Sequence, residues 1–111
     1  MRLGLFGGTF DPIHFGHLRA AVEVKQGFDL DQVVMIPAAQ PPHKTGDQVS
    51  DAMDRLKMVE LGVRGYSGFS VSDVELQRSG PSYSIDTINH FKTSSGKDSE
   101  VFFISGLDAF L

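Results

Sequence analysis

The sequence predicts an α/β protein with a parallel sheet, and three observations support this class. Short apolar runs alternate along the chain with longer segments of helical periodicity. The first two apolar runs end directly at glycine or proline, which terminate strands. The chain has 111 residues, of which 41% are hydrophobic, and this is enough for one core. We therefore expect a single domain over residues 1–111.

Four strands are expected, at about residues 2–6, 32–36, 69–76 and 101–104. Gly7 ends the first strand and Pro37 ends the second. The second strand has the unbroken apolar run that is typical of a strand buried on both faces. The third begins with alternating side chains, Phe69, Val71 and Asp73. This pattern predicts four strands that are connected by helices.

Three helices are expected between these strands. The first covers about residues 17–26, with Leu18, Ala21 and Val22 on one face and Val24 nearer the flank. Ser50 can cap the second, in which Arg55 is expected on the solvated side or in an ion pair. Ser82 or Ser84 can cap the third, and residues 93–99 are expected to form a polar loop. The expected core residues of the second and third helices are Met53, Leu56, Val59 or Glu60, Val63, Ile85, Ile88 and Phe91, and those elsewhere include Phe69, Phe102 and Phe103.

The composition excludes several classes of protein. The chain has no cysteine, so disulfide scaffolds, cysteine–zinc sites and thiol nucleophiles are excluded. Ten Lys and Arg against 14 Asp and Glu, a net charge of −4, argue against nucleic acid as a partner. No apolar run approaches the ~20 residues of a membrane helix. The first residues are too short an apolar run for a signal peptide, and we expect a soluble cytoplasmic protein with no membrane partner.

The segment from Gly7 to His17 is the strongest indication of a functional site. Its two adjacent glycines follow a strand and let the backbone approach a ligand closely. The turn leads to a helix start, where free N–H groups and the helix dipole favour phosphate. His14 and His17 lie three residues apart across that start, and both rings can donate hydrogen bonds to an anion. We therefore predict a phosphate site.

Other interpretations of this segment stay open at this point. It could be a glycine turn with two solvated histidines, or the histidines could be a zinc pair, although no third ligand has a recognisable spacing. It is neither a P-loop nor a G-x-G-x-x-G dinucleotide pattern. Two more unusual segments, residues 37–44 and 106–108, also follow strands. The carboxyl ends of parallel strands share one edge of a sheet, so we expect the three segments to meet there.

Residues 7–17 resemble the signature of the HxGH nucleotidyltransferase superfamily, with His14-Phe15-Gly16-His17 as the H-x-G-H element. Three further segments resemble those of the bacterial nicotinate-nucleotide adenylyltransferase family: Ile36-Pro37 with Pro41-Pro42-His43-Lys44, residues 81–87 (PSYSIDT) and residues 104–108 (ISGLD). All four occur in the family's order and cover essentially the whole chain. The resemblance implies a half-Rossmann sheet with flanking helices. It also implies transfer of the adenylyl group from ATP to nicotinate mononucleotide in NAD biosynthesis, giving nicotinate adenine dinucleotide and pyrophosphate.

The resemblance also implies a role for individual residues. His14 and His17 are the expected catalytic residues, which hold the triphosphate and the transition state. The expected contacts to ATP and its phosphates are Gly7, Gly8, Thr9, Phe10, His14, His17, Lys44, Gly106 and Asp108. The expected contacts to nicotinate mononucleotide are Gly8, His43, Lys44, Tyr83, Ser84 and Thr87. Mg²⁺ is expected to accompany ATP, without a protein ligand.

The chain departs from the family pattern at two points. Ser84 stands where the family usually has threonine, which keeps the hydroxyl group. The chain ends at Leu111, whereas the family continues with an aromatic segment and a phosphate-binding Ser/Thr-rich stretch. We therefore expect a nucleotidyltransferase domain whose C-terminal part is missing. Two alternatives stay open: a catalytically silent nucleotide-binding fragment, and an adenylyltransferase of the phosphopantetheine or nicotinamide mononucleotide branch. Partner chains could cover apolar surface beside the last strand, so a homo-oligomer is also an open alternative.

Overall fold

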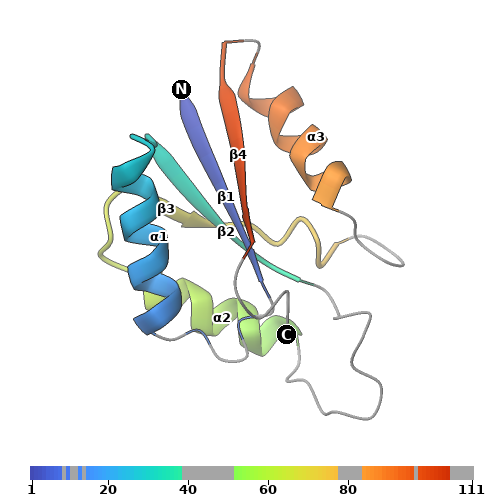
Figure 1. The fold of residues 1–111 in the computed structure, drawn as a ribbon. Coiled ribbons are helices and arrows are strands. Elements are labelled where there is room, and N and C mark those ends of the chain that lie inside the picture. The colour runs from blue at the N-terminus through green and yellow to red at the C-terminus, as the bar shows by residue number, and fades with distance from the viewer. Residues whose placement is uncertain are drawn as a thin grey trace.

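The computed structural model of the chain describes residues 1–8, 10, 13, 15–38, 52–77, 84–96 and 98–105. Strands and helices alternate along it (Figure 1). The elements are β1 (Arg2–Gly8), α1 (Phe15–Gly27), β2 (Gln32–Pro37), α2 (Ala52–Val63), β3 (Phe69–Val71), α3 (Ser84–Ser95) and β4 (Glu100–Ser105). This order confirms the predicted α/β class.

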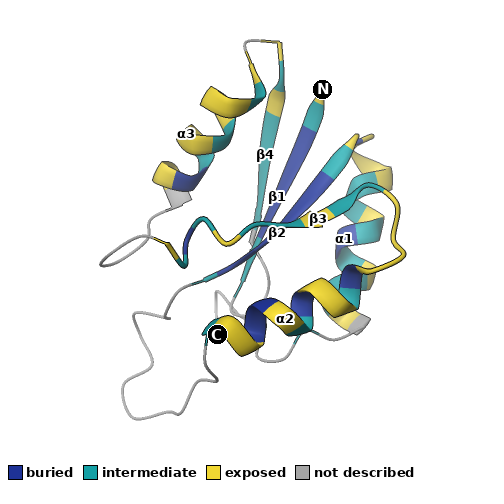
Figure 2. Cartoon of the chain, turned by 180° about the vertical axis from the view of Figure 1, so that it is seen from behind, coloured by how far each residue is buried: buried dark blue, intermediate teal, exposed yellow. Residues whose placement is uncertain are grey.

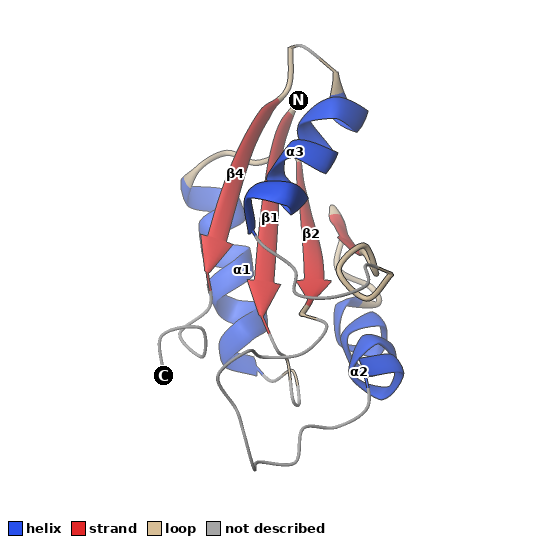
Figure 3. Cartoon of the chain, turned by 90° about the vertical axis from the view of Figure 1, so that its right-hand side faces the viewer, coloured by secondary structure: helices blue, strands red, loops and turns tan. Residues whose placement is uncertain are grey.

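The four strands form one parallel sheet in the order β3-β2-β1-β4. β1 is therefore paired along both edges, with Leu5 opposite Val34 of β2 and Phe103 of β4. Figure 3 shows β1, β2 and β4 running toward the same end of the molecule. The carboxyl ends of these three strands therefore form one edge, as the sequence predicts.

Helices cover both faces of the sheet, α1 and α2 on one and α3 on the other (Figures 1 and 3). Successive side chains of a strand point to opposite faces, so each strand contributes to two layers of core. Figure 2 shows that the buried residues concentrate in β1 and β2, between these layers. The layer under α1 and α2 contains Phe6, Phe10, Ala21, Leu30, Val33, Met35, Val59 and Val63. The layer under α3 contains Leu3, Leu5, Val34 and Ile36, with Ile88 and Phe91 packed against it.

The helix predictions hold in placement but not at every residue. α1 begins two residues before the expected position, and α3 runs to Ser95, into the expected polar loop. Met53 and Ile85 were expected in the core but are 59% and 60% exposed, because the inward faces of their helices centre on other residues. Val24, expected at the flank of α1, packs against the core. The four phenylalanines expected in the core all pack against it: Phe69, Phe91, Phe102 and Phe103.

The prediction for the third strand was wrong beyond Val71, where β3 ends. The Ser72 hydroxyl accepts a hydrogen bond from the amide of Val74, and the Asp73 carbonyl accepts bonds from the amides of Leu76 and Gln77. Such local bonds offer the backbone an alternative to the sheet and turn the chain away from it. Val74 nevertheless reaches the core layer under α3.

Arg2 connects the C-terminal end of α1 to the end of the sheet where β1 begins. Its Nε and Nη2 atoms donate to the carbonyl oxygen of Phe28, at 3.0 and 2.7 Å. Its Nη1 atom lies 3.2 Å from a carboxylate oxygen of Glu100 at the start of β4. A cation at a helix C-terminus is favourable. With this end fixed, α1 begins near the opposite edge of the sheet, where β1 ends (Figure 3).

In the part of the chain that is described, no helix is both long and apolar enough to cross a membrane.

Candidate functional site

The candidate site lies where β1 and its two neighbours end. Gly7 is in register with Ile36 of β2 and Ser105 of β4, and Gly8 is in register with Pro37. The chain goes from β1 to β2 and β3 on one side, then returns to place β4 on the other side of β1. Ligands of open α/β sheets bind outside the carboxyl ends of strands at such a reversal of strand order. The predicted glycine pair therefore stands at the expected place.

Neighbouring rings leave little room for a side chain at either glycine. A Cβ atom on Gly7 would lie 3.2 Å from the Phe103 ring, on the α3 face of the sheet. A Cβ atom on Gly8 would lie 3.2 Å from two ring atoms of Phe10, on the opposite face. Both glycines thus serve packing as well as close approach of the backbone. β1 ends here as bare backbone with an aromatic ring on each side.

Phe10 anchors the chain that follows β1. Its side chain is fully buried, with its ring centroid 5.9 Å from that of Phe6. Its backbone φ is +50°, a left-handed conformation that is strained for a bulky residue. Ile13, three residues later, also packs against this core layer. A Cβ atom on Gly62 of α2 would lie 3.3 Å from its side chain. The packing of the Phe10 and Ile13 side chains therefore fixes two points of the chain between β1 and α1.

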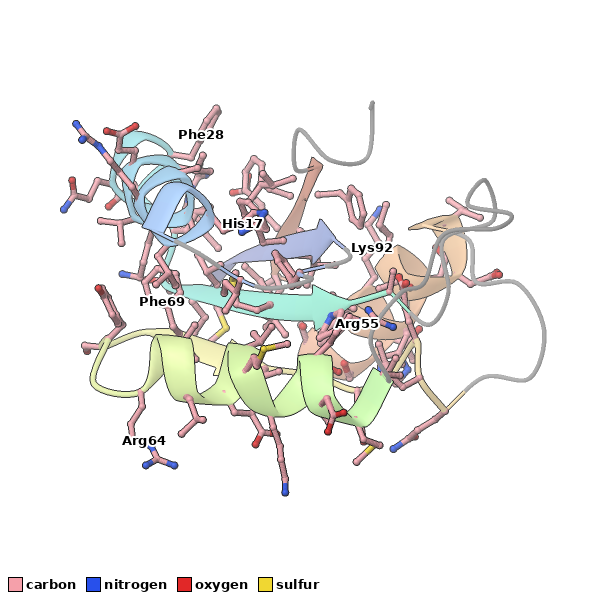
Figure 4. The ribbon with its side chains drawn as sticks, turned by 90° about the horizontal axis from the view of Figure 1, so that it is seen from below. His17, Phe28, Arg55, Arg64, Phe69 and Lys92 are labelled. Carbon is pink, nitrogen blue, oxygen red and sulfur yellow. The ribbon has the colours of Figure 1, made fainter. Side chains whose placement is uncertain are left out.

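His17 lies in the first turn of α1 and is half-buried. Its ring packs edge-on against Phe10, with 5.2 Å between the ring centroids. Figure 4, which looks along the sheet from below, shows His17 between α1 and the end of β1. The structure therefore places His17 beside Phe10, whose ring also borders Gly8. A backbone strand end, a helix start and an imidazole are a donor set suited to phosphate oxygens.

Arg55 belongs to this region. Of the two positions expected for it, solvated or ion-paired, the solvated one was wrong. The side chain is 1% exposed, on the inward face of α2 with Leu56, Val59 and Val63. Its Nη1 atom donates to the carbonyl oxygen of Ala38 at 2.7 Å. Ala38 follows the last residue of β2, and its own amide donates to the carbonyl oxygen of Gly8 at 2.8 Å. The helical spacing of Arg55 from Val59 was the signal in the sequence that could have revealed its burial.

Thr87 is fully buried in α3, and its hydroxyl donates to a carboxylate oxygen of Glu75 at 2.8 Å. Glu75 lies in the turn after β3 and is 9% exposed. The family resemblance implies a contact of Thr87 with the mononucleotide, whereas in the structure its hydroxyl makes a buried hydrogen bond. The pair links the first turns of α3 to the chain that leaves β3, and Glu75 had no assigned role in the sequence analysis.

Of the remaining predicted site residues, only Ser84 lies in the part of the chain that the structure describes. Ser84 is the first residue of α3. The others lie outside the described residues and stay predictions: Thr9, His14, His43, Lys44, Tyr83, Gly106 and Asp108.

The residues that the structure describes show no second candidate site. Among the described side chains, no group of three His, Asp or Glu residues could hold a metal ion. A surface hollow of about 290 Å³ is lined by Leu18, Arg19, Val22, Glu23 and Tyr66, none of which is a predicted site residue. The strand ends around Gly8 therefore remain the candidate site.

Residues 5–111 match the model of the cytidylyltransferase-like family. Curated relatives named as probable nicotinate-nucleotide adenylyltransferases are similar to the whole chain. The protein from Desulfatibacillum aliphaticivorans is 53% identical over 111 residues, which are 100% of this chain and 50% of the relative. The protein from Pseudomonas fluorescens is 50% identical over 109 residues, 98% of this chain and 50% of the relative. The chain thus spans about half the length of the curated relatives it matches.

Solved structures show the same fold. The nicotinic acid mononucleotide adenylyltransferase of Plasmodium falciparum, complexed with NaAD, superposes with a TM-score of 0.68 at 15% identity. The similarity covers 92% of this chain and 50% of that one. A second structure of the same protein, complexed with APC, gives a TM-score of 0.66 at 13% identity and covers 92% of this chain and 49% of that one. The parallel sheet with its flanking helices is thus the predicted Rossmann-like fold, and the chain belongs to the cytidylyltransferase-like family.

Proposed function

We propose that this chain forms the nucleotide-binding core of an adenylyltransferase that acts on nicotinate mononucleotide. The full-length protein would transfer the adenylyl group of ATP to this mononucleotide and release nicotinate adenine dinucleotide and pyrophosphate. The observation that carries the proposal is the end of β1. There Gly7 lies between two parallel neighbours, and the ring of Phe10, which borders Gly8, packs against the ring of His17 in the first turn of α1.

The comparisons support the same substrate class. Relatives about half identical to this chain carry the name nicotinate-nucleotide adenylyltransferase. The Plasmodium falciparum structures contain NaAD or APC and share the fold. The fold alone fits many activities. Together with the glycines and His17 at the reversal of strand order, the fold favours the binding and transfer of phosphate groups at the carboxyl ends of the strands.

The chemistry needs few side chains. A phosphate oxygen of the mononucleotide attacks the α-phosphorus of ATP, a new P–O bond forms, and the bond to the pyrophosphate leaving group breaks. Because the second pKa of a phosphate is near 6, the attacking group is largely anionic at pH 7 and needs no general base. Alignment of the two phosphates and stabilisation of their charge are then the main work of the site.

Each group at the edge has a part in this scheme. Backbone near Gly8 and the start of α1 would hold phosphate oxygens. His17 would donate a hydrogen bond to the triphosphate as charge builds up on it during transfer, and His14 would assist. His43 and Lys44 would add positive charge, Tyr83 and Ser84 would contact the nicotinate moiety, and Asp108 would accept from a ribose hydroxyl. ATP would bind as its Mg²⁺ complex, with the ion held by phosphate and water. We place the reaction in the cytoplasm, where ATP is available.

The test is release of pyrophosphate by the full-length protein that contains this chain. We expect release with ATP and nicotinate mononucleotide together, and none when either is omitted. A parallel assay with nicotinamide mononucleotide measures the preference for the acid. Faster turnover of the amide would assign the protein to another branch, and no release with either mononucleotide would refute the proposal.

A further inference from the structure

The guanidinium group of Arg55 stands at an unusual position for a charge. It is 1% exposed, on the inward face of α2, in line with the apolar Leu56 and Val59. A buried charge must be compensated by hydrogen bonds, or it destabilises the fold. The exposed face of the same helix carries Lys57, whose charge remains in water. A buried arginine here therefore calls for a specific partner.

One such partner is the peptide at which the chain leaves β2. Arg55 Nη1 donates to the carbonyl oxygen of Ala38 at 2.7 Å, and the amide of Ala38 donates to the carbonyl oxygen of Gly8 at 2.8 Å. Ala38 thus uses both of its backbone hydrogen-bonding groups, one toward α2 and one toward the end of β1. Figure 4 shows Arg55 between α2 and the end of β2. The contacts form a continuous path from the helix to the candidate site.

We propose that Arg55 is a positioning residue for adenylyl transfer, which fixes Ala38 and, through it, the carboxyl end of β1. This inference rests on the proposed function. The guanidinium is buried, and the proposed role is exerted through its bond to Ala38. Its planar donors set both the direction and the distance of the bond, which the ammonium of lysine does not. Because transfer depends on alignment, a small displacement of Gly8 is expected to lower kcat.

The central experiment compares Arg55→Lys with the wild type in the full-length protein. Lysine keeps the charge but loses the planar donors. We expect kcat to fall about tenfold at a temperature well below Tm, while KM for both substrates changes by less than about threefold. Lys57→Met is the matched control, because it removes one exposed cation from the same helix. We expect its kcat to equal that of the wild type.

A second measurement follows the contact directly. Hydrogen exchange at the Ala38 amide should be about tenfold faster in Arg55→Lys, whereas exchange at Val33 and Val34 should be unchanged. Wild-type kcat in Arg55→Lys would overturn the proposal, whether or not exchange at Ala38 is faster. Unchanged exchange at Ala38 would also overturn it, since the bond would then not fix this peptide.

Two results call for a different measurement: a variant that does not fold, and a wild type that has no activity. If Arg55→Lys does not fold, Ala38→Gly replaces it, because glycine keeps both backbone groups but loosens the chain at this point. A lower kcat in Ala38→Gly supports the proposal and a wild-type kcat overturns it. If the wild type releases no pyrophosphate, the proposed function fails. The role of Arg55 in fixing Ala38 is then judged by exchange alone.

Discussion

At the scale of single residues, His17 combines packing with a proposed chemical role. Its ring lies edge-on to Phe10, 5.2 Å between centroids, at the end of β1. We expect His17→Ala to lower kcat by about 100-fold, because a donor to the charge of the transition state is lost, and to change KM little. Steady-state kinetics of the full-length protein measures both constants.

His90 provides the control for this substitution. It is an exposed histidine on α3 whose ring also packs edge-on against a phenylalanine, Phe91, with 5.1 Å between centroids. We expect His90→Ala to keep the wild-type kcat. Equal losses of kcat and of substrate affinity in His17→Ala would contradict the proposed role.

Gly8 illustrates how packing restricts the site to glycine. An added Cβ atom would lie 3.2 Å from the ring of Phe10, which Phe6 and His17 hold in place. We expect Gly8→Ala to lower the free energy of unfolding by about 1–3 kcal/mol, as overpacked cores do. Gly27→Ala is the control, since nothing lies within 4 Å of its added Cβ atom in the last position of α1. Urea denaturation should show no loss of stability there, and equal losses in both variants would contradict this account.

At the scale of elements, the bond between Thr87 and Glu75 joins α3 to the turn after β3. We expect Thr87→Val to lower the free energy of unfolding by about 1–3 kcal/mol, because a buried carboxylate loses a donor. The exposed Thr93 on the same helix is the control, and Thr93→Val should stay within about 0.5 kcal/mol of the wild type. A raised KM for nicotinate mononucleotide without loss of stability would instead favour the ligand contact that the sequence resemblance implies.

The sequence predicted elements well where one physical signal dominates. β1, β2 and β4 are apolar runs, and their ends were predicted to within two residues. β3 was predicted too long, because the hydrogen bonds of Ser72 and Asp73 outweigh the alternating pattern that continues past them. Arg55 was misplaced because charge normally indicates solvent. The helical spacing of Arg55 from Val59 indicates its burial, but the carbonyl of Ala38 that it bonds lies 17 residues away, and no local pattern reveals this partner.

The same distinction holds for the candidate site: a local signal indicated some residues, whereas other contacts depend on the tertiary structure. The glycines and His17 were predicted from their position after a strand and at a helix start, and in the structure the ring of Phe10 lies between Gly8 and His17. The buried hydrogen bond of Thr87 was not predicted, because its partner Glu75 is 12 residues away on another segment. Sequence motifs thus indicated residues that lie at the carboxyl ends of the strands. The contacts that hold the edge in place depend on tertiary structure.

At the scale of the whole molecule, the central strand of the sheet is protected, whereas the outer strand β3 is weakly held. β1 has a paired strand on each side and helices over both faces, and Leu5 and Phe6 are 0% and 2% exposed. β3 has three residues, pairs with β2 alone among the described strands, and includes the exposed Ser70. Local opening costs least where few contacts are lost. The centre should therefore open only when the whole domain unfolds.

Hydrogen exchange of the 111-residue chain tests this gradient. We expect the amides of Leu5 and Phe6 to exchange only through global unfolding, and that of Ser70 in β3 to exchange at least ~100-fold faster through local opening. Denaturant separates the two routes, because only global unfolding exposes enough surface for a strong dependence on its concentration. If the amides of β3 exchanged as slowly as those of β1, with the same denaturant dependence, the sheet would unfold as one unit. The end of β1, which carries Gly7 and Gly8, would then share the stability of the edge strand rather than exceed it.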